Sequence, residues 1–150
     1  MSSIFDELRA DHDRQRGLIA DVLRTVGESG DRAALFRELR AELAAHAAME
    51  ERHFYAPLMQ HDITQDAARH GVAEHKDLDD LIEALESYDM SGPKWIDAAD
   101  ELAHKLEHHL EEEEREFFPV AGKALTEAQK AELGGAYRAG MQREQASVRG

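Results

Sequence analysis

The strongest constraint on this chain is an internal repeat with a period of 63 residues. Shifting the sequence by that distance places His12 on His75 and His46 on His109. His46 and His109 each begin the pattern His-x-x-x-Glu-Glu-Arg-x-Phe-aromatic, and a proline follows each copy. Because each copy has the pattern of a helical hairpin, the repeat predicts two matching hairpins and a pseudo-two-fold bundle. Such a bundle suits a site built from equivalent groups of both halves.

Apolar residues recur three and four positions apart along four long segments, which is the spacing of amphipathic helices. Breaks separate these segments at Gly27–Gly30, His61–Thr64, Ser91–Pro93 and Gly122–Thr126. The composition is rich in Ala, Leu, Glu and Arg, and no stretch sustains a period of two, so no strand competes with the helices. We therefore predict an all-α protein, an up-down-up-down four-helix bundle at about residues 3–123 of a single domain spanning 1–150.

Capping residues predict where the helices begin and end. The first helix should cover about residues 4–26. The second should follow an Asp31 cap and run to near Met59. Thr64 should cap the third helix, and Pro93 should lie in the first turn of the fourth, a position where its missing N–H has no cost.

Pro57 and Pro119 should end or kink the second and fourth helices, because a proline ring clashes with the preceding turn. The run Thr126-Glu-Ala-Gln is a capping box, and it predicts a short, weaker fifth helix within the segment 126–150. We expect that helix to end in a frayed tail, and either to pack on the bundle or to dimerise it. The protein should therefore be a monomer or a homodimer.

Six candidate metal ligands fall on the apolar faces of the predicted helices. His46 and Glu50 are one helical turn apart on one face, and the pair His109 and Glu113 repeats this spacing. Each His lies 15 or 16 residues from the turn of its hairpin, or roughly 22–24 Å along a helix. The His of both hairpins should therefore meet at one level. The predicted layer contains four imidazoles and two carboxylates: His12, His46, Glu50, His75, His109 and Glu113.

Such a layer is unfavourable without a cation, since a buried unpaired carboxylate costs several kcal/mol and two close carboxylates repel. A pair of metal ions would offset that cost. Four nitrogen and two oxygen ligands without sulfur suit Fe, Mn or Zn. Two carboxylates for two metals suggest that Glu50 and Glu113 both bridge, leaving two His on each metal and open positions for water, oxide, O₂, peroxide or NO. Any single His could instead be an ordinary hydrogen-bonded core histidine, but the shared layer and the repeat favour the metal site.

The remaining His are more ordinary. His53 is matched by Glu116 in the repeat, so we expect it on the surface. His104 and His108 lie one turn apart and could hold a stray metal ion. His108 also forms a His-x-x-x-Glu pair with Glu112, but the alignment of the repeat favours the neighbouring His as the ligand.

Two further acidic residues, Glu51 and Glu114, lie one position off the apolar faces. We expect them beside the ligands or on the surface, where they could pair with Arg52 and Arg115. The four aromatic residues of the repeat are expected to pack in the core and shield the site from solvent. They are Phe54, Tyr55, Phe117 and Phe118.

Composition narrows the function classes. The chain has 32 Asp and Glu against 18 Lys and Arg, a formal net charge of −14 with neutral His, which argues against nucleic acid or an anionic membrane surface as a partner. It has no Cys, which excludes disulfides, thiolate metal sites and iron–sulfur clusters. No apolar run approaches the roughly 20 residues of a membrane span, and the acidic amphipathic start is unlike a signal peptide. We therefore expect a soluble cytoplasmic protein.

The sequence resembles the hemerythrin-like, or HHE cation-binding, family over about residues 8–120. The resemblance rests on the six candidate ligands and on the aromatic-proline ending of each repeat. It implies a four-helix bundle that holds a non-heme di-iron centre with bridging carboxylates and an oxide or hydroxide bridge, with Zn or Mn as substitute metals. It also implies binding of O₂, peroxide or NO, in sensing, iron and oxygen handling or oxidative-stress defence. The alternatives are a peroxide-consuming enzyme with the same centre and a metal-free helical interaction module.

One position departs from the family pattern. The O₂-carrying hemerythrins have a fifth His four residues before the His of the third helix, and Gly71 stands there in this chain. His70 is adjacent but points about 100° away on a helix. A simple reversible O₂ carrier is therefore less favoured than a more open or symmetric centre, in which water, Glu74 or a shifted side chain fills the gap.

Overall fold

A computed structural model describes residues 2–27 and 30–149, and no strand occurs in these ranges. Residues 28 and 29 of the predicted break at Gly27–Gly30 lie outside the described residues, as does Gly150 of the predicted tail. The long helices are α1 (Ile4–Leu23), α2 (Gly30–Glu50), α4 (Gln65–Ser87), α5 (Pro93–Glu112) and α7 (Glu127–Arg149). Shorter elements continue α2 and α5: the π-helical turn η1 (Glu51–Tyr55) with α3 (Ala56–Leu58), and the π-helical turn η2 (Glu113–Phe117) with α6 (Phe118–Ala124).

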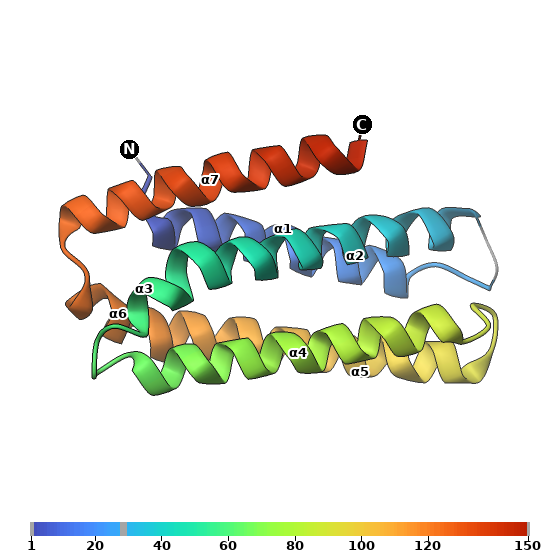
Figure 1. Cartoon of the computed structure of the whole chain (residues 1–150). Coiled ribbons are helices and arrows are strands. Elements are labelled where there is room, and N and C mark those ends of the chain that lie inside the picture. The colour runs from blue at the N-terminus through green and yellow to red at the C-terminus, as the bar shows by residue number, and fades with distance from the viewer. Residues whose placement is uncertain (1, 28–29, 150) are drawn as a thin grey trace.

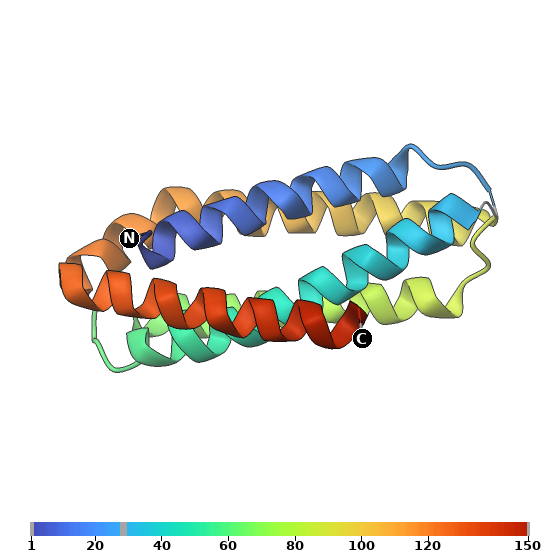
Figure 2. The same cartoon turned by 90° about the horizontal axis from the view of Figure 1, so that it is seen from above.

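The helices form two antiparallel hairpins, α1 with α2 and α4 with α5, that pack into a four-helix bundle (Figure 1). The all-α bundle predicted from the repeat is confirmed. The fifth long helix, α7, runs along the hairpin of α1 and α2 and packs on both (Figure 2). Within the described ranges, no helix combines the length and the apolar character needed to cross a bilayer.

The core consists of two apolar clusters with a layer of buried polar side chains between them. Along α1, Ile4 and Leu8 belong to the first cluster, and Leu18 and Val22 belong to the second. His12, which is fully buried, lies between them. The apolar clusters on both sides therefore hold the polar layer at a fixed depth inside the bundle.

The two prolines of the repeat differ in their effect: Pro57 ends its helix, as predicted, whereas Pro119 does not. Pro57 is followed closely by the end of its helix at Leu58, but the helix containing Pro119 continues to Ala124. A π-helical turn precedes both prolines, and in η2 the N–H of Phe118 donates to the carbonyl of residue 113, five positions earlier. The wider turn accommodates a residue that has no N–H to donate, so helical structure continues past Pro119.

Arg32 explains why the first turn differs from the predicted one. The first helix ends at Leu23 rather than near residue 26, and the second begins at Gly30 without an Asp31 cap. The buried guanidinium of Arg32 donates to the hydroxyl and the carbonyl of Thr25, at 2.8 and 2.6 Å. These bonds hold Thr25 in the connection, which ends the first helix early.

The next two boundaries agree with the prediction, but the caps differ in detail. The third long helix follows Thr64, as expected, although the Thr64 hydroxyl donates to the carbonyl of Leu58 at 2.6 Å instead of capping the helix. Pro93 is the first residue of α5, and the preceding Gly92 is its N-cap.

The C-terminal helix is the main correction to the predicted fold. The capping box at Thr126 is present, with its hydroxyl and the side chain of Gln129 each accepting a backbone N–H. The helix that follows is 23 residues long, not short. Its inner face is sparse, with Tyr137 and Met141 buried. Gly134 also lets it approach the backbone of Ser3 at the start of α1. This close packing stabilises the long helix. The weak apolar pattern of the segment does not indicate it.

Candidate metal centre

The six predicted ligands lie together in the buried polar layer. Their common level agrees with the nearly equal distances of the four His from the hairpin turns. Glu50 is the last residue of α2, and Glu113 is the first residue of η2. Neighbouring imidazole rings are 5.0–6.2 Å apart between centroids. The convergence expected from the repeat is therefore present. The four His come from four different helices, α1, α2, α4 and α5: His12, His46, His75 and His109.

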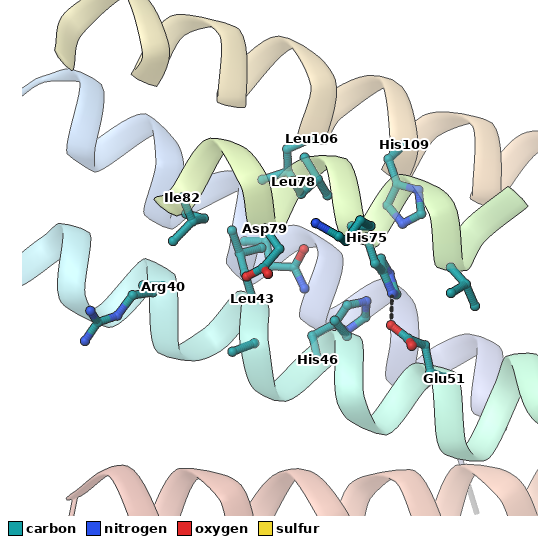
Figure 3. A pocket seen from close by; sticks show the side chains of 15 residues that line it. Arg40, Leu43, His46, Glu51, His75, Leu78, Asp79, Ile82, Leu106 and His109 are labelled. Carbon is teal, nitrogen blue, oxygen red and sulfur yellow. Dashed lines mark hydrogen bonds and ion pairs between the residues drawn. The ribbon is translucent and has the colours of Figure 1, made fainter. Parts of the chain in front are cut away.

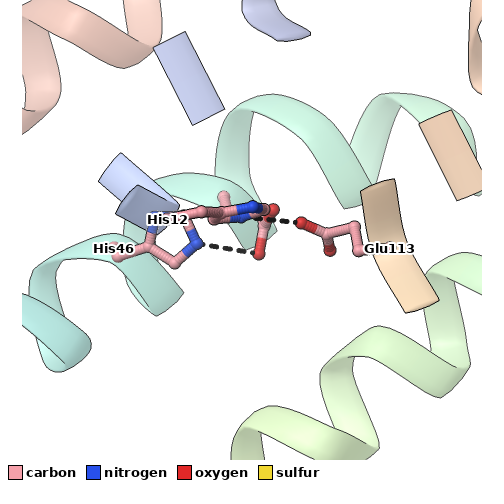
Figure 4. Close-up of side chains that lie close together, drawn as sticks. His12, His46 and Glu113 are labelled. Carbon is pink, nitrogen blue, oxygen red and sulfur yellow. Dashed lines mark ion pairs between the residues drawn. The ribbon is translucent and has the colours of Figure 1, made fainter. Parts of the chain in front are cut away.

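Each carboxylate lies between two imidazoles. The Oε1 atom of Glu50 is 3.3 Å from Nε2 of His46 and 3.0 Å from Nε2 of His75. The carboxylate of Glu113 has its two oxygens 3.1 Å from Nε2 of His12 and 3.9 Å from Nε2 of His109. Figure 4 shows His12, His46 and Glu113 pointing toward one another. Both carboxylates therefore occupy positions from which they could bridge two ions.

The six residues can be divided into two groups that could each hold a metal ion. Within each group, one ligand atom from every residue lies within 4.8 Å of the others. Glu50 belongs to both groups, as a bridging ligand would. The first group is His12, His46, Glu50 and Glu113, and the second is Glu50, His75 and His109.

The two nitrogens of each imidazole have different environments. Every Nε2 is buried and has no hydrogen-bond partner among the described residues, although carboxylate oxygens lie close by. Every Nδ1 has a partner, at 2.6–2.8 Å: Glu114 for His12, Tyr137 for His46, Glu51 for His75 and Glu74 for His109. A carboxylate can only accept, so a neutral ring in such a pair carries its proton on Nδ1 and leaves the Nε2 lone pair free. This is the usual arrangement of metal-binding histidines. The donor set therefore fits a pair of cations.

The pKa shifts in the layer show that its buried carboxylates need a compensating positive charge. Burial lowers the pKa of His46, but the charge of Glu50 and hydrogen bonds outweigh burial and raise that pKa to about 10. For His75, the nearby carboxylates of Glu50 and Glu51 likewise outweigh burial and raise the pKa to about 9. Burial and the charge of Glu50 raise the pKa of Glu113 above its usual value. In the metal-free protein, protonated imidazoles thus supply the positive charge that the two carboxylates need.

The position of the family's fifth His is filled by the ring of Tyr55. A Cβ atom on Gly71 would collide with that ring. The Tyr55 hydroxyl donates to Glu113, and burial together with the charges of Glu50 and Glu113 raises the pKa of the phenol well above its usual value. The sequence predicted Tyr55 only as core packing. Glu74, an alternative for the gap, instead binds His109.

Two further residues of the site were missed in the sequence. Tyr137 of α7 donates its phenol proton to Asp11 and accepts from Nδ1 of His46. Asp11 is also 3.9 Å from that ring nitrogen. The sequence does contain one signal for Tyr137, since it lies with Met141 on an apolar face of the fifth helix. That signal was not enough, because the sequence did not show which helices this face packs against.

The predictions for the neighbouring residues have mixed outcomes. Glu51 and Glu114 lie beside the candidate ligands, where they contact His75 and His12. In the described ranges neither carboxylate pairs with Arg52 or Arg115, the alternative expectation. Arg16 also binds Glu114, at 2.9 Å, and these contacts with His12 and Arg16 lower the pKa of Glu114 to about 2. His53 is half-buried and lies close to Gly140 of α7, so it is only partly at the surface where it was predicted.

A cavity of about 390 Å³ adjoins the layer. His46, His75 and His109 line it, together with apolar side chains such as Leu43 and Leu106 (Figure 3). Gln15 also lines this cavity. Its amide is fully buried, and neither of its polar atoms has a hydrogen-bond partner in the described part of the chain. The cavity is large enough for a diatomic or triatomic ligand beside the Nε2 atoms.

Comparison with known proteins agrees with this geometry. A family model described as Hemerythrin HHE cation binding domain matches residues 3–121. The fold is similar to the crystal structure of a Hemerythrin HHE cation binding domain-containing protein from Mycobacterium kansasii, with a TM-score of 0.88 and 28% sequence identity. That match covers 98% of this chain and 90% of the other. No curated protein matches the chain.

Proposed function

This chain belongs to the Hemerythrin HHE cation-binding domain family, and on that premise we propose that it is a non-heme di-iron protein that binds O₂ or a related small ligand such as peroxide or NO. One observation carries the proposal. Four buried Nε2 atoms without hydrogen-bond partners among the described residues surround two buried carboxylates. A layer of this kind is stable only when cations or protons compensate its charge.

In this proposal the six side chains divide into terminal and bridging ligands. His12 and His46 serve one ion and His75 and His109 serve the other, while Glu50 and Glu113 bridge. The donor set also accepts Zn or Mn, because it contains imidazole and carboxylate groups without sulfur. Two bound iron ions would supply reversible binding and electron transfer for O₂, peroxide or NO.

The surrounding residues control how the ligands are presented. Glu114, Glu51 and Glu74 hold three of the rings through Nδ1 and keep each Nε2 directed at the layer. The cavity beside His46, His75 and His109 gives a small apolar molecule room to reach the layer. The amide of Gln15 offers a hydrogen bond to a polar ligand there. These features suit sensing, oxygen or iron handling, or defence against oxidative stress.

The phenol of Tyr55 favours a second candidate, a peroxide-consuming enzyme with the same centre. Peroxide breakdown requires proton transfer, and the raised pKa of the neighbouring phenol would be lowered by two bound cations, so that its hydroxyl could donate and recover a proton. Tyr55 contacts Glu113 directly. The two candidates share one metal site and differ only in turnover.

Metal analysis and optical spectra test the proposal. Protein prepared with iron should contain two Fe per chain, and its spectrum should change on exposure to air or peroxide. Glu113→Ala should lose most of the iron, whereas Glu116→Ala, an exposed neighbour on the same π-helical turn, should keep it. Colourless, metal-free protein whose melting is unaffected by a chelator would refute the di-iron function. Sustained peroxide consumption would favour the enzyme, and stable reversible oxygenation would favour the carrier or sensor.

A further inference from the structure

A second group of His and Glu lies outside the buried centre, on the surface where α4 and α5 pack together. It repeats the His-x-x-x-Glu spacing of the buried ligands. His70 and Glu74 are one turn apart on α4, and His108 and Glu112 are one turn apart on α5. His70 and His108 are exposed, whereas Glu74 and Glu112 are half-buried. The antiparallel packing of the two helices brings the pairs together.

The geometry of this surface cluster is close to that of a metal site. Nε2 of His70 lies 2.8 Å from Oε1 of Glu112 and 3.3 Å from Oε2 of Glu74. These three ligand atoms all lie within 4.8 Å of one another. Ligand atoms bound at about 2.0–2.2 Å around a shared ion are roughly 3 Å apart, so small movements suffice. Nε2 of His108 lies 3.1 Å from the other oxygen of Glu112 and orients that carboxylate.

The surface cluster is linked to the buried centre through Glu74. One oxygen of Glu74 accepts from Nδ1 of His109 at 2.8 Å, and its other oxygen faces His70. A cavity of about 130 Å³ is lined by His70, Glu74 and Glu112 on the outside. Two buried ligands, His109 and Glu113, line the same cavity. Nε2 of His109 is buried and has no hydrogen-bond partner within the described chain.

We propose that His70, Glu74 and Glu112 form an exposed binding site for a divalent transition-metal ion, and that this site supplies ions to the buried centre. Imidazole and carboxylate ligands suit Fe²⁺, Mn²⁺ and Zn²⁺. The carboxylates of Glu74 and Glu112 bring two negative charges, which a divalent ion neutralises. The net charge of −14 also raises the local concentration of cations. The supply role rests on the proposed di-iron function, but binding at the surface does not.

Zinc binding to iron-loaded protein tests the surface site. The protein is dialysed to equilibrium against micromolar Zn²⁺, and both metals are then counted by elemental analysis. Wild type and His104→Ala should each retain one more Zn²⁺ per chain than His70→Ala and Glu112→Gln. His104 is a matched control, because it is exposed one turn before His108 on the same helix and belongs to none of the groups of three or more converging ligands among the described residues. Equal zinc in all four proteins would overturn the site, whereas iron other than two per chain would count against the proposed function alone.

Iron uptake tests the supply role. Metal-free protein is mixed anaerobically with limiting Fe²⁺, and the free ion is followed with a chromogenic chelator. His70→Ala and Glu112→Gln should take up Fe²⁺ several-fold more slowly than wild type and His104→Ala, and reach the same final iron content. Equal rates in all four proteins would overturn the supply role.

Discussion

The hydroxyl of Tyr137 on α7 lies 2.6 Å from Nδ1 of His46 on α2 and accepts its hydrogen bond. The other three imidazoles are held by carboxylates of the four-helix bundle itself. The fifth helix is therefore part of the candidate metal site, and its docking and the orientation of His46 depend on each other. Asp11 completes the contact by accepting the hydrogen bond of the phenol hydroxyl.

Replacing Tyr137 with Phe should weaken metal binding while preserving the fold. The loss of a hydrogen-bond partner that orients a metal-binding His typically costs about 10–100-fold in affinity. Competition with a chelator measures the change, and Tyr88→Phe, at a partly exposed ring 39% accessible, provides the control. Equal metal affinity in both variants would show that Tyr137 does not position His46.

Gly134 should be essential for docking α7, and its neighbour should not be. A Cβ on Gly134 would lie 2.7–2.8 Å from backbone atoms of Ser2, Ser3 and Ile4, so a backbone segment would have to shift, whereas a Cβ on Gly135 meets nothing within 4 Å. Gly134→Ala should therefore destabilise the protein by about 1–3 kcal/mol. Gly135→Ala should be neutral or stabilising by up to about 1 kcal/mol, since Ala favours helix. Thermal unfolding of both variants checks the prediction, and equal melting temperatures would contradict it.

The convergence of the six candidate ligands could be predicted from the sequence because their placement follows local rules. His46 and Glu50 share a helix face by their spacing, and the repeat assigns the same relation to His109 and Glu113. Tyr137 could not be assigned in this way, because its contact with His46 joins residues of two helices that are 91 positions apart in sequence. Such contacts depend on how helices pack, which periodicity does not determine.

The role of Gly71 also depends on a contact between helices that the sequence pattern does not determine. The sequence shows that the fifth His is absent, but not that the ring of Tyr55, from another helix, fills its space. The fifth helix was underestimated for a related reason. Its docking requires a glycine at position 134, because a larger residue would collide with the backbone at the start of α1. A hydrophobic pattern gives no indication of this requirement.

Gly71 and Tyr55 should be energetically coupled. Gly71→Ala should cost about 1–3 kcal/mol in the wild-type background, because the Tyr55 ring occupies the space of the added methyl group. In a Tyr55→Leu background the same substitution should cost much less, since the ring is gone. A double-mutant cycle from denaturant unfolding measures the coupling, with Gly17→Ala as a helical control that meets nothing within 4 Å. Additive effects of the two substitutions would contradict the coupling.

Gln15 should lower the stability of the metal-free protein and strengthen the binding of a polar ligand in the cavity. Its buried amide has no hydrogen-bond partner in the described residues, so Gln15→Leu should stabilise the metal-free protein by about 1–3 kcal/mol. The same change should speed dissociation of a polar ligand from the cavity, because a hydrogen bond to that ligand is lost. Thermal unfolding and stopped-flow dissociation measure the two effects. Lower stability combined with unchanged dissociation would refute this assignment.

Metal binding should release protons at neutral pH. The pKa values of about 10 for His46 and about 9 for His75 mean that both rings are protonated in the metal-free protein at pH 7. Because a metal ion requires the neutral imidazole, binding should release about two protons, and affinity should rise with pH up to that range. Calorimetry in two buffers with different ionisation heats counts the released protons, and binding without proton release at pH 7 would contradict the prediction.

The same pKa shifts predict how the metal-free protein responds to pH. Both folded-state values lie above the usual histidine value of 6.5. The charged imidazoles therefore stabilise the fold fully below about pH 6.5, and this stabilisation is lost as the pH rises through about 9 and then about 10. Metal-free protein should melt at a lower temperature at pH 10 than at pH 7, and bound metal should remove most of this difference, because the ions replace the protons as the compensating charge. Melting curves of both forms at the two pH values test the argument, and a metal-free protein more stable at pH 10 than at pH 7 would refute it.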